Sequence, residues 1–180
     1  MQTEAEHRKK LKHYNIPGHA HYLTFSCYHR FDYLSDMESC SILMEELDGA
    51  RTEFQVYLWA YVLMPNHVHL LIYPYRDAYD MSTILQAVKG RTSKRYGALL
   101  REKRPKHYER FLVRIGQKMK FRFWQAGGGF DRNLWNPETI HPAINYIEAN
   151  PVRVQLGSQP GRLALVLGVR PSHRLWCSPR

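Results

Sequence analysis

The segment 64–72, "MPNHVHLLI", decides the fold of this chain. It opens with a Pro-Asn pair that favours a tight turn, and it continues as an aliphatic run typical of a buried strand. Residues 54–63, "FQVYLWAYVL", have the same strand character before the turn, so the two segments are predicted to pair as an antiparallel hairpin. Side chains alternate along a strand, and His67 and His69 are therefore expected to point to one face.

Further strands and helices are predicted on both sides of this hairpin. They are a strand at 19–30, a helix from Ser35 or Asp36 to about Gly49, a helix at 80–100, an edge strand at 121–125 and a helix within 136–150. Pro142 would interrupt the last helix, so its main part is expected to begin near His141. It is expected to end by Asn150, because Pro151 follows.

The order of these elements predicts the fold class. Strand, helix, strand, strand, helix, strand is the order of a ferredoxin-like α+β fold, an antiparallel sheet with helices on one face, and one further helix follows at the C-terminal side. Residues 101–120 are basic and poorly periodic, and they are predicted to be a loop or a mobile extension.

Length and composition indicate one domain. The chain has 180 residues, which we divide into a basic N-terminal arm at 1–18 and a single domain at 19–180. A run of about 18 apolar residues and an apolar signal core are both absent from the sequence, so a cytoplasmic protein without a membrane span is expected. The three cysteines are widely spaced and odd in number, which favours neither a disulfide framework nor a zinc site.

The positive charge is concentrated in one segment. The net charge is +10, and residues 89–122 contain 13 basic and only two acidic residues. Clustered Lys and Arg gain affinity for polyanions by releasing counterions from phosphates, so a nucleic acid is the expected partner. A solvated, highly charged surface is the alternative. DNA binding by residues 89–122 should weaken steeply with salt, and a shallow salt dependence would contradict this assignment.

Two histidines on one strand face suggest a metal site, although such a pair more often only hydrogen-bonds backbone groups or faces solvent. One ion needs further ligands, and the helix containing "NYIEANP", 145–151, can supply them. Tyr146 and Asn150 are four residues apart and share a helix face. A phenol is a candidate nucleophile, and an amide oxygen is a candidate ligand for Mg²⁺ or Mn²⁺. Core packing for Tyr146 and helix termination for Asn150 are the alternatives.

The combination of motifs resembles a known family. "MPNHVHLLI", followed about 75 residues later by "YIEANPVR", is similar to the single-tyrosine HUH transposases, in which HUH stands for His, hydrophobic residue, His. Within them the chain most resembles the REP-associated tyrosine transposases, also through "FWQAGGGFDRN" at 123–133 and "WCS" at 176–178. The resemblance extends from about residue 19 to 178. Each motif is weak alone, and their order and spacing make the combination specific.

The resemblance implies roles for particular residues. His67 and His69 match the metal-binding histidines, Tyr146 matches the catalytic tyrosine, and Asn150 matches a third polar ligand. The implied fold is that of HUH endonucleases, with the C-terminal helix as the catalytic helix and Mg²⁺ or Mn²⁺ as the metal. The implied reaction is cleavage and transfer of single-stranded DNA through a 5′-phosphotyrosine.

The partner implied by the family is single-stranded or hairpin DNA, such as a repetitive extragenic palindrome, met in the cytoplasm at the nucleoid by a monomer or a homodimer. We expect DNA contacts from seven basic residues, Lys89, Arg91, Lys94, Arg95, Arg122, Arg132 and Arg153. Lys89 is also a candidate aid to deprotonation of the tyrosine. The three glycines at 127–129 are a candidate hinge for the tyrosine helix.

Two other functions compete with the transferase. A catalytically inactive module of the same fold would bind single-stranded or hairpin nucleic acid through the basic segment alone. A metal-dependent hydrolase that activates water would need acidic ligands, and the sequence has no Asp or Glu within seven residues of the histidine pair. The combination of Tyr146 with the pair favours the transferase.

Overall fold

The fold is described from a computed structural model, which covers residues 13–153 and, for side chains, residues 13–150. The strands are β1 Ala20–Ser26, β2 Val56–Met64, β3 His67–Pro74, β4 Leu112–Ile115, β5 Lys118–Phe121 and β6 Phe130–Leu134. The α-helices are α1 Met37–Glu53, α2 Met81–Lys103, α3 Pro105–Glu109 and α4 Pro137–Arg153. Two short 3-10 turns, Tyr28–Arg30 and Tyr33–Ser35, connect β1 to α1.

A four-stranded antiparallel sheet forms the centre of the molecule, with strand order β2-β3-β1-β6. The predicted hairpin is confirmed: β2 and β3 pair directly, with Met64 opposite His67. β1 lies between β3 and β6, with Ser26 opposite His67 and Thr24 opposite His69. This order and the all-antiparallel pairing are those of a ferredoxin-like sheet, which confirms the predicted fold class.

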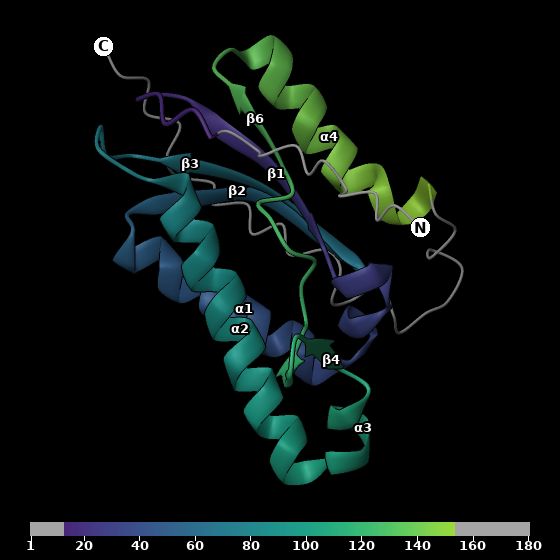
Figure 1. Cartoon of the computed structure of the whole chain (residues 1–180). Coiled ribbons are helices and arrows are strands. Elements are labelled where there is room, and N and C mark those ends of the chain that lie inside the picture. Colours follow the sequence, from purple (N-terminus) through teal and green to yellow (C-terminus); the bar gives the residue numbers. More distant parts are fainter. Residues whose placement is uncertain (1–12, 154–180) are drawn as a thin grey trace, which may run out of the picture.

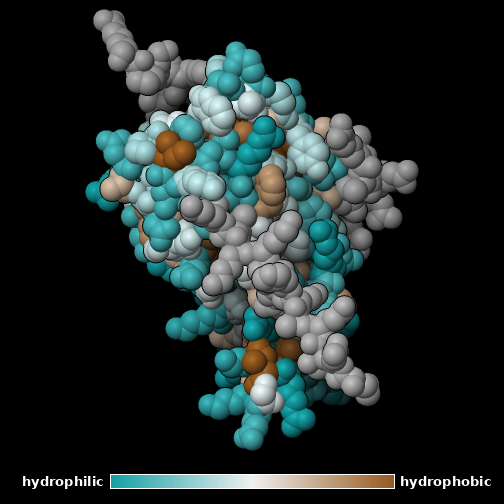
Figure 2. Space-filling model, turned by 45° about the horizontal axis from the view of Figure 1, so that its top comes forward, coloured by the Kyte–Doolittle hydropathy of each residue, from teal (hydrophilic) through white to brown (hydrophobic). Residues whose placement is uncertain are grey.

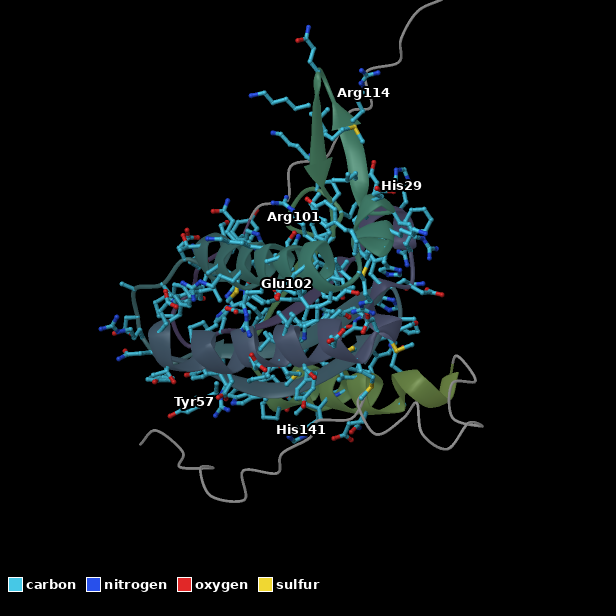
Figure 3. All side chains as sticks on the ribbon, turned by 90° about the horizontal axis from the view of Figure 1, so that it is seen from below. His29, Tyr57, Arg101, Glu102, Arg114 and His141 are labelled. Carbon is cyan, nitrogen blue, oxygen red and sulfur yellow. The ribbon has the colours of Figure 1, made fainter. Side chains whose placement is uncertain are left out.

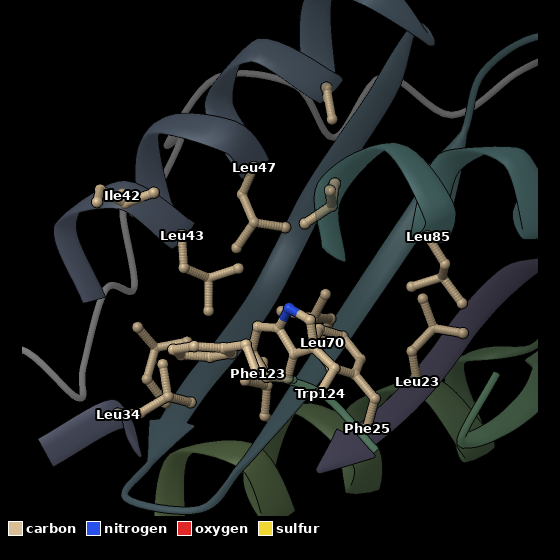
Figure 4. Packing of buried hydrophobic residues seen from close by; sticks show 14 of the residues in the cluster. Leu23, Phe25, Leu34, Ile42, Leu43, Leu47, Leu70, Leu85, Phe123 and Trp124 are labelled. Atoms are coloured by element: carbon tan, nitrogen blue, oxygen red, sulfur yellow. The ribbon is translucent and has the colours of Figure 1, made fainter. Parts of the chain in front are cut away.

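The sheet separates two apolar clusters, one on each face. Leu23, Phe25, Val68 and Leu70 point toward α1 and α2, where they join the larger core that includes Leu43, Leu47 and Leu85 (Figure 4). On the opposite face, Val62, Leu71 and Leu134 pack against Ile147 of α4. Figure 1 shows α4 on the side of the sheet away from α1 and α2. Because residues alternate along β3, the histidines share the α4 face with Leu71.

The last helix begins earlier than the sequence predicted. Asn136 caps it, since its Oδ1 accepts a hydrogen bond from the Thr139 backbone N–H at 3.0 Å, and Pro137 occupies the first helical position. The expected start near His141 is therefore wrong, and so is the expected end by Asn150, because α4 continues through Pro151 to Arg153. Pro142 lies in the second turn, where the missing N–H removes one intrahelical hydrogen bond without ending the helix, because burial of Ile147 holds the helix on the sheet.

Residues 101–129 are more ordered than predicted. Helix α2 continues to Lys103, α3 follows, and β4 and β5 pair as a separate two-stranded antiparallel ribbon, called here the β4–β5 ribbon. The prediction of a loop at 101–120 is wrong. The predicted edge strand at 121–125 is reduced to one antiparallel bridge, between Trp124 and Cys27. The edge of the main sheet is β6 instead, paired with β1. Local periodicity missed the ribbon because its strands have only four residues each.

Residues 13–18, the described part of the expected arm, lie against the domain. Nδ1 of His13 is 2.5 Å from Oδ2 of Asp131 on β6, and Oδ1 of Asn15 accepts a hydrogen bond from the Met81 backbone N–H at 3.1 Å. The remainder of the arm, and the "WCS" block, lie outside the described residues. None of the described helices is long and apolar enough to cross a membrane.

Candidate active site

The two histidines of β3 face each other. Nε2 of His67 lies 3.1 Å from Nε2 of His69, and the ring planes are nearly perpendicular, at 83°. His69 is buried and His67 is half-buried at the edge of the α4 face. The predicted common orientation of the pair is therefore observed, with both ring tips directed at one point.

The tautomer of His67 follows from its hydrogen-bond partners. Nδ2 of Asn66 donates to Oδ1 of Asp32 at 3.2 Å, which leaves Oδ1 of Asn66 facing Nδ1 of His67 at 2.7 Å. An amide oxygen only accepts, so Nδ1 of His67 carries the proton and donates it. The lone pair of the neutral ring therefore lies on Nε2, toward His69. Burial, and then the charge of Arg30, lowers the pKa of His67 and favours this neutral form.

The second histidine is held by two hydroxyl groups of β1. Nδ1 of His69 lies 2.8 Å from both Oη of Tyr22 and Oγ1 of Thr24. A hydroxyl both donates and accepts, so these partners accommodate either tautomer of His69. Burial, and then the neighbouring His67, lowers the pKa of His69 to about 4. Both imidazoles are therefore neutral at physiological pH, as metal coordination requires.

The structure brings Tyr146 beside this pair. The ring of Tyr146 meets the ring of His69 edge to face, with centroids 5.6 Å apart at 84°, and the ring of Tyr22 at 6.4 Å. Tyr146 is 41% exposed, so its side chain is accessible to a large substrate. The helix positions it through Ile147, which is fully buried against the face of the sheet opposite the main core.

A hollow of about 450 Å³ opens next to the tyrosine. Its lining includes Tyr22 of β1, Arg132 of β6, and Glu138 and Tyr146 of α4. Of the seven basic residues predicted to contact DNA, Arg132 is thus the one that shares a cavity with Tyr146 in the described part of the chain. Asn150 lies one helical turn beyond Tyr146 and is 6% exposed. Its role as a ligand remains a prediction.

The histidine pair fits two positions of a metal coordination sphere. Two nitrogens about 2.0–2.1 Å from one ion and 3.1 Å from each other subtend roughly 100° at the ion, between the tetrahedral and octahedral angles. Within residues 13–153, no group of three or more His, Cys, Asp or Glu side chains is arranged to hold an ion. The remaining ligands would therefore be oxygen donors, such as the Asn150 amide, water or a substrate phosphate, which suits Mg²⁺ or Mn²⁺.

Two of the predicted DNA contacts on α2 are engaged within the protein. Arg91 pairs with Glu53, and Arg95 pairs with Glu45 at 2.5 Å and Glu46 at 2.7 Å, all of them carboxylates of α1. Figure 3 shows these two helices side by side. The charge of this part of the basic segment is therefore partly balanced, which the sequence did not reveal because α1 is about 45 residues away along the chain.

Lys89 also differs from expectation. Its side chain is half-buried, and Nζ donates to the Gly127 carbonyl oxygen at 2.8 Å and lies 5.4 Å from the Phe25 ring centroid. Burial lowers the pKa of Lys89 to about 8. Phe25 belongs to the α1/α2 face of the sheet, whereas Tyr146 lies on the other face. Lys89 is thus not placed to deprotonate Tyr146.

The other predicted contacts are distributed over the surface. Lys94 is exposed on α2, and Arg122 is half-buried beside a groove of about 600 Å³ that Lys120 and Trp124 also line. The backbone of Arg153 ends α4, and its side chain lies outside the described residues. DNA binding by all seven residues stays a prediction.

The glycine segment proposed as a hinge does not adjoin the tyrosine helix. Strand β6, which is paired with β1, stands between it and α4. A Cβ on Gly129 would lie 2.1 Å from the Thr24 carbonyl oxygen, and Gly129 has φ +84°. This glycine is therefore required for close packing against the strand that holds His69, and the idea of free motion around residues 127–129 is wrong for it.

Sequence reasoning missed the residues that orient the histidines. Tyr22 and Thr24 are two residues apart on β1 and therefore share a face of the strand. Only the pairing of β1 with β3 shows that this is the face of His69. The sequence identified Asn66 as a turn residue, but it did not predict the contact of Asn66 with His67.

Comparison with known proteins adds two results. Residues 17–126 match the family described as "Transposase IS200 like". The matched residues include the histidine pair and end before α4, which carries Tyr146. No curated protein matches the chain.

The chain is also similar to solved structures. One is a REP-associated tyrosine transposase bound to a REP hairpin, with a TM-score of 0.61 and 16% identity over 81% of this chain and 74% of that one. A second is a putative transposase from Deinococcus radiodurans R1, with 24% identity over 78% of this chain and 95% of that one, and a TM-score of 0.46. The first likeness shows that the two proteins share a fold.

Proposed function

The chain belongs to the IS200-like transposase family, and from this premise we propose that it is a metal-dependent single-stranded DNA endonuclease and strand transferase that acts through a 5′-phosphotyrosine. Its substrate in this proposal is a DNA hairpin with a single-stranded flank, such as a repetitive extragenic palindrome. The solved relative bound to a REP hairpin supports this choice of substrate.

One observation carries the proposal: an accessible phenol lies against a pair of neutral, convergent imidazoles. The centroids of Tyr146 and His69 are 5.6 Å apart, and the two Nε2 atoms of the pair are 3.1 Å apart. A nucleophile and a cation site this close can act on the same backbone phosphate. A module that only binds nucleic acid has no need for this convergence.

The histidines would hold the divalent ion, with Asn150 as the proposed third ligand. When bound, the ion would polarise the scissile phosphate and stabilise the charge that develops on its oxygens. The partners of the two histidines serve to fix the ring orientations, since the Asn66 amide holds His67 and the hydroxyls of Tyr22 and Thr24 hold His69.

The covalent step exchanges one phosphate ester for another. Oη of Tyr146 attacks the phosphorus and loses its proton, the bond from phosphorus to the 3′ oxygen breaks, and that oxygen leaves as a 3′-OH after taking up a proton. The 5′ end of the DNA stays on the tyrosine. A second 3′-OH can reverse the step or join a new strand, and no external energy source is needed, because the number of phosphate ester bonds is unchanged. Arg132, which lines the hollow beside Tyr146, would bind a neighbouring phosphate.

Covalent trapping tests the proposal. The full chain is incubated with 5′-flanked hairpin DNA labelled on its 3′ side and with Mg²⁺ or Mn²⁺, and a protein–DNA adduct is looked for under denaturing conditions. The adduct should form with the wild type and be lost in Tyr146→Phe and in His67→Ala. Tyr57→Phe, a matched change at another exposed tyrosine, should keep it. Hairpin binding without an adduct in the wild type would favour the inactive binding module instead.

A further inference from the structure

The β4–β5 ribbon projects from the body of the protein. Figure 3 shows it extending beyond α2, with Arg114 near its end, on the side away from α4. Each strand has four residues, so the paired part is about 13 Å long at roughly 3.3 Å per residue. Residues 114–120 are all exposed. The main sheet and its helices gain no packing from this part of the ribbon, which indicates a role outside the fold.

Each exposed cation of the ribbon lies opposite an apolar residue. The pairs are Arg114 with Met119, Ile115 with Lys118 and Val113 with Lys120. Directly opposed residues share a face, so both faces of the ribbon present a cation beside an apolar side chain. In Figure 2, the projection at the bottom of the view shows brown apolar atoms between teal hydrophilic ones.

The charge of the ribbon is not balanced within the protein. Residues 110–129 contain no Asp or Glu. Among residues 13–150, no ion pair or side-chain hydrogen bond involves Arg114, Lys118 or Lys120. By contrast, Arg91 and Arg95 of α2 are paired with carboxylates. The cations of the ribbon therefore remain available for an outside anion.

Aromatic rings pack the root of the ribbon against α2 and α3. The ring of Phe121 stacks on those of Tyr108 and Phe111, with centroids 5.2 and 5.0 Å apart. A Cβ at Gly97 of α2 would lie 3.3 Å from the Phe121 ring, so this glycine admits the ring against the helix. A fixed root lets the ribbon hold a partner in one orientation, because little conformational entropy is lost on binding.

The root also connects to the histidine end of the sheet. The rings of Phe111 and Tyr33 are 4.0 Å apart, and the next backbone N–H, that of Leu34, donates to the Pro65 carbonyl oxygen at 2.8 Å. Pro65 is two residues before His67. A nucleic acid held by the ribbon is therefore anchored on the same end of the sheet as the histidine pair.

We infer that the β4–β5 ribbon binds the duplex stem of the DNA substrate by lying in its major groove, an inference that rests on the proposed function and names the part of the substrate that the ribbon holds. The major groove of B-DNA is about 12 Å wide and admits a two-stranded ribbon, whereas the minor groove, about 6 Å wide, does not. Cations on both faces reach the phosphates on the two sides of the groove, and the apolar partners contact base edges such as thymine methyls.

Equilibrium binding tests the inference. Two DNA probes of equal length are used in the Tyr146→Phe background, a hairpin with a stem of about one helical turn and a short flank, and an unpaired strand with the same flank. The variant is Lys118→Gln/Lys120→Gln. The matched control, Arg51→Gln/Arg76→Gln, removes the same charge near the opposite end of β3, where the Tyr75 backbone N–H bonds to Gln55.

The ribbon variant should bind the hairpin roughly tenfold more weakly or worse, and its slope of log affinity against log salt should be smaller by about 1.8, since each phosphate contact contributes about 0.9. The affinity of the ribbon variant for the unpaired strand should change by about twofold at most, and so should the affinity of the control variant for the hairpin. Lys118→Arg/Lys120→Arg should restore binding, which excludes misfolding as the cause.

An equal loss for the hairpin and the unpaired strand, or no loss, would overturn the inference. Failure of the proposed function has a different signature, because it is the absence of an adduct in the chain with Tyr146 intact. The ribbon result is read from binding alone.

Discussion

Tyr146 and His69 come from segments 77 residues apart, and their rings meet edge to face at 5.6 Å. The contact crosses from the C-terminal helix to the second strand of the central hairpin. It places a phenol at the open side of the imidazole pair, and the chemistry proposed for this chain depends on that placement.

The hydroxyls of Tyr22 and Thr24 provide a first prediction. A cation on Nε2 of His69 requires a proton on Nδ1, and that proton needs an acceptor, which either hydroxyl supplies at 2.8 Å. Tyr22→Phe and Thr24→Val alone should each weaken Mn²⁺ binding modestly. The double variant should weaken it by about 10–100-fold, measured by isothermal titration calorimetry. If the loss of binding free energy in the double variant only equals the sum of the losses in the two single variants, the two hydroxyls do not share the acceptor role.

Asn150 provides a second prediction. If its amide is the third ligand, Asn150→Ala should weaken Mn²⁺ binding by roughly tenfold or more, because among the described residues no His, Cys, Asp or Glu completes a three-ligand site with the pair. Asn145→Ala is the matched control, since Asn145 is exposed on the same helix. Calorimetry on both variants decides the matter, and equal affinities would remove Asn150 from the ligand set.

Gly129 gives a prediction about stability. Gly129→Ala would bring a Cβ to 2.1 Å from the Thr24 carbonyl oxygen and should lower the free energy of unfolding by roughly 3 kcal/mol or more. Gly127 also has a positive φ, +96°, but its Cβ would meet nothing within 4 Å, so Gly127→Ala should lower that free energy by only about 1 kcal/mol. Urea denaturation of both variants measures the difference, and equal losses would show that the contact with Thr24 relaxes freely.

The depressed pKa of His69 predicts how stability changes with pH. In the unfolded chain His69 titrates near its ordinary pKa of about 6.5, whereas burial lowers the folded value to about 4. The unfolded state therefore binds more protons between these values, and the free energy of unfolding should fall as pH falls from 7 to 5. We expect a contribution on the order of 1 kcal/mol between pH 7 and pH 5.

The measurement is urea denaturation with a chelator present, at pH 7 and pH 5. His69→Asn should show a smaller decrease than the wild type, because asparagine does not titrate. An equal decrease in the two proteins would show that His69 is not protonated differently in the folded and unfolded states.

Much of the fold was predictable because its signals are local. The β2–β3 hairpin, α1 and α2 follow from a turn pair, apolar strand segments, a cap at Ser35 or Asp36 and helical periodicity, all read within a few residues. The ribbon and the true start of α4 were not predicted. The strands of the ribbon have only four residues each, too few to show an alternating pattern. In α4, the burial of Ile147 outweighs the local cost of Pro142 in a helix.

The sequence by itself determined that His67 and His69 share a face, since a strand alternates its side chains whatever it packs against. Only the tertiary structure decided which face that is, that Tyr146 meets it, and that Tyr22 and Thr24 hold His69. These contacts depend on how β1 and α4 register against β3, and that register results from burying two apolar clusters at once, a property of the whole chain.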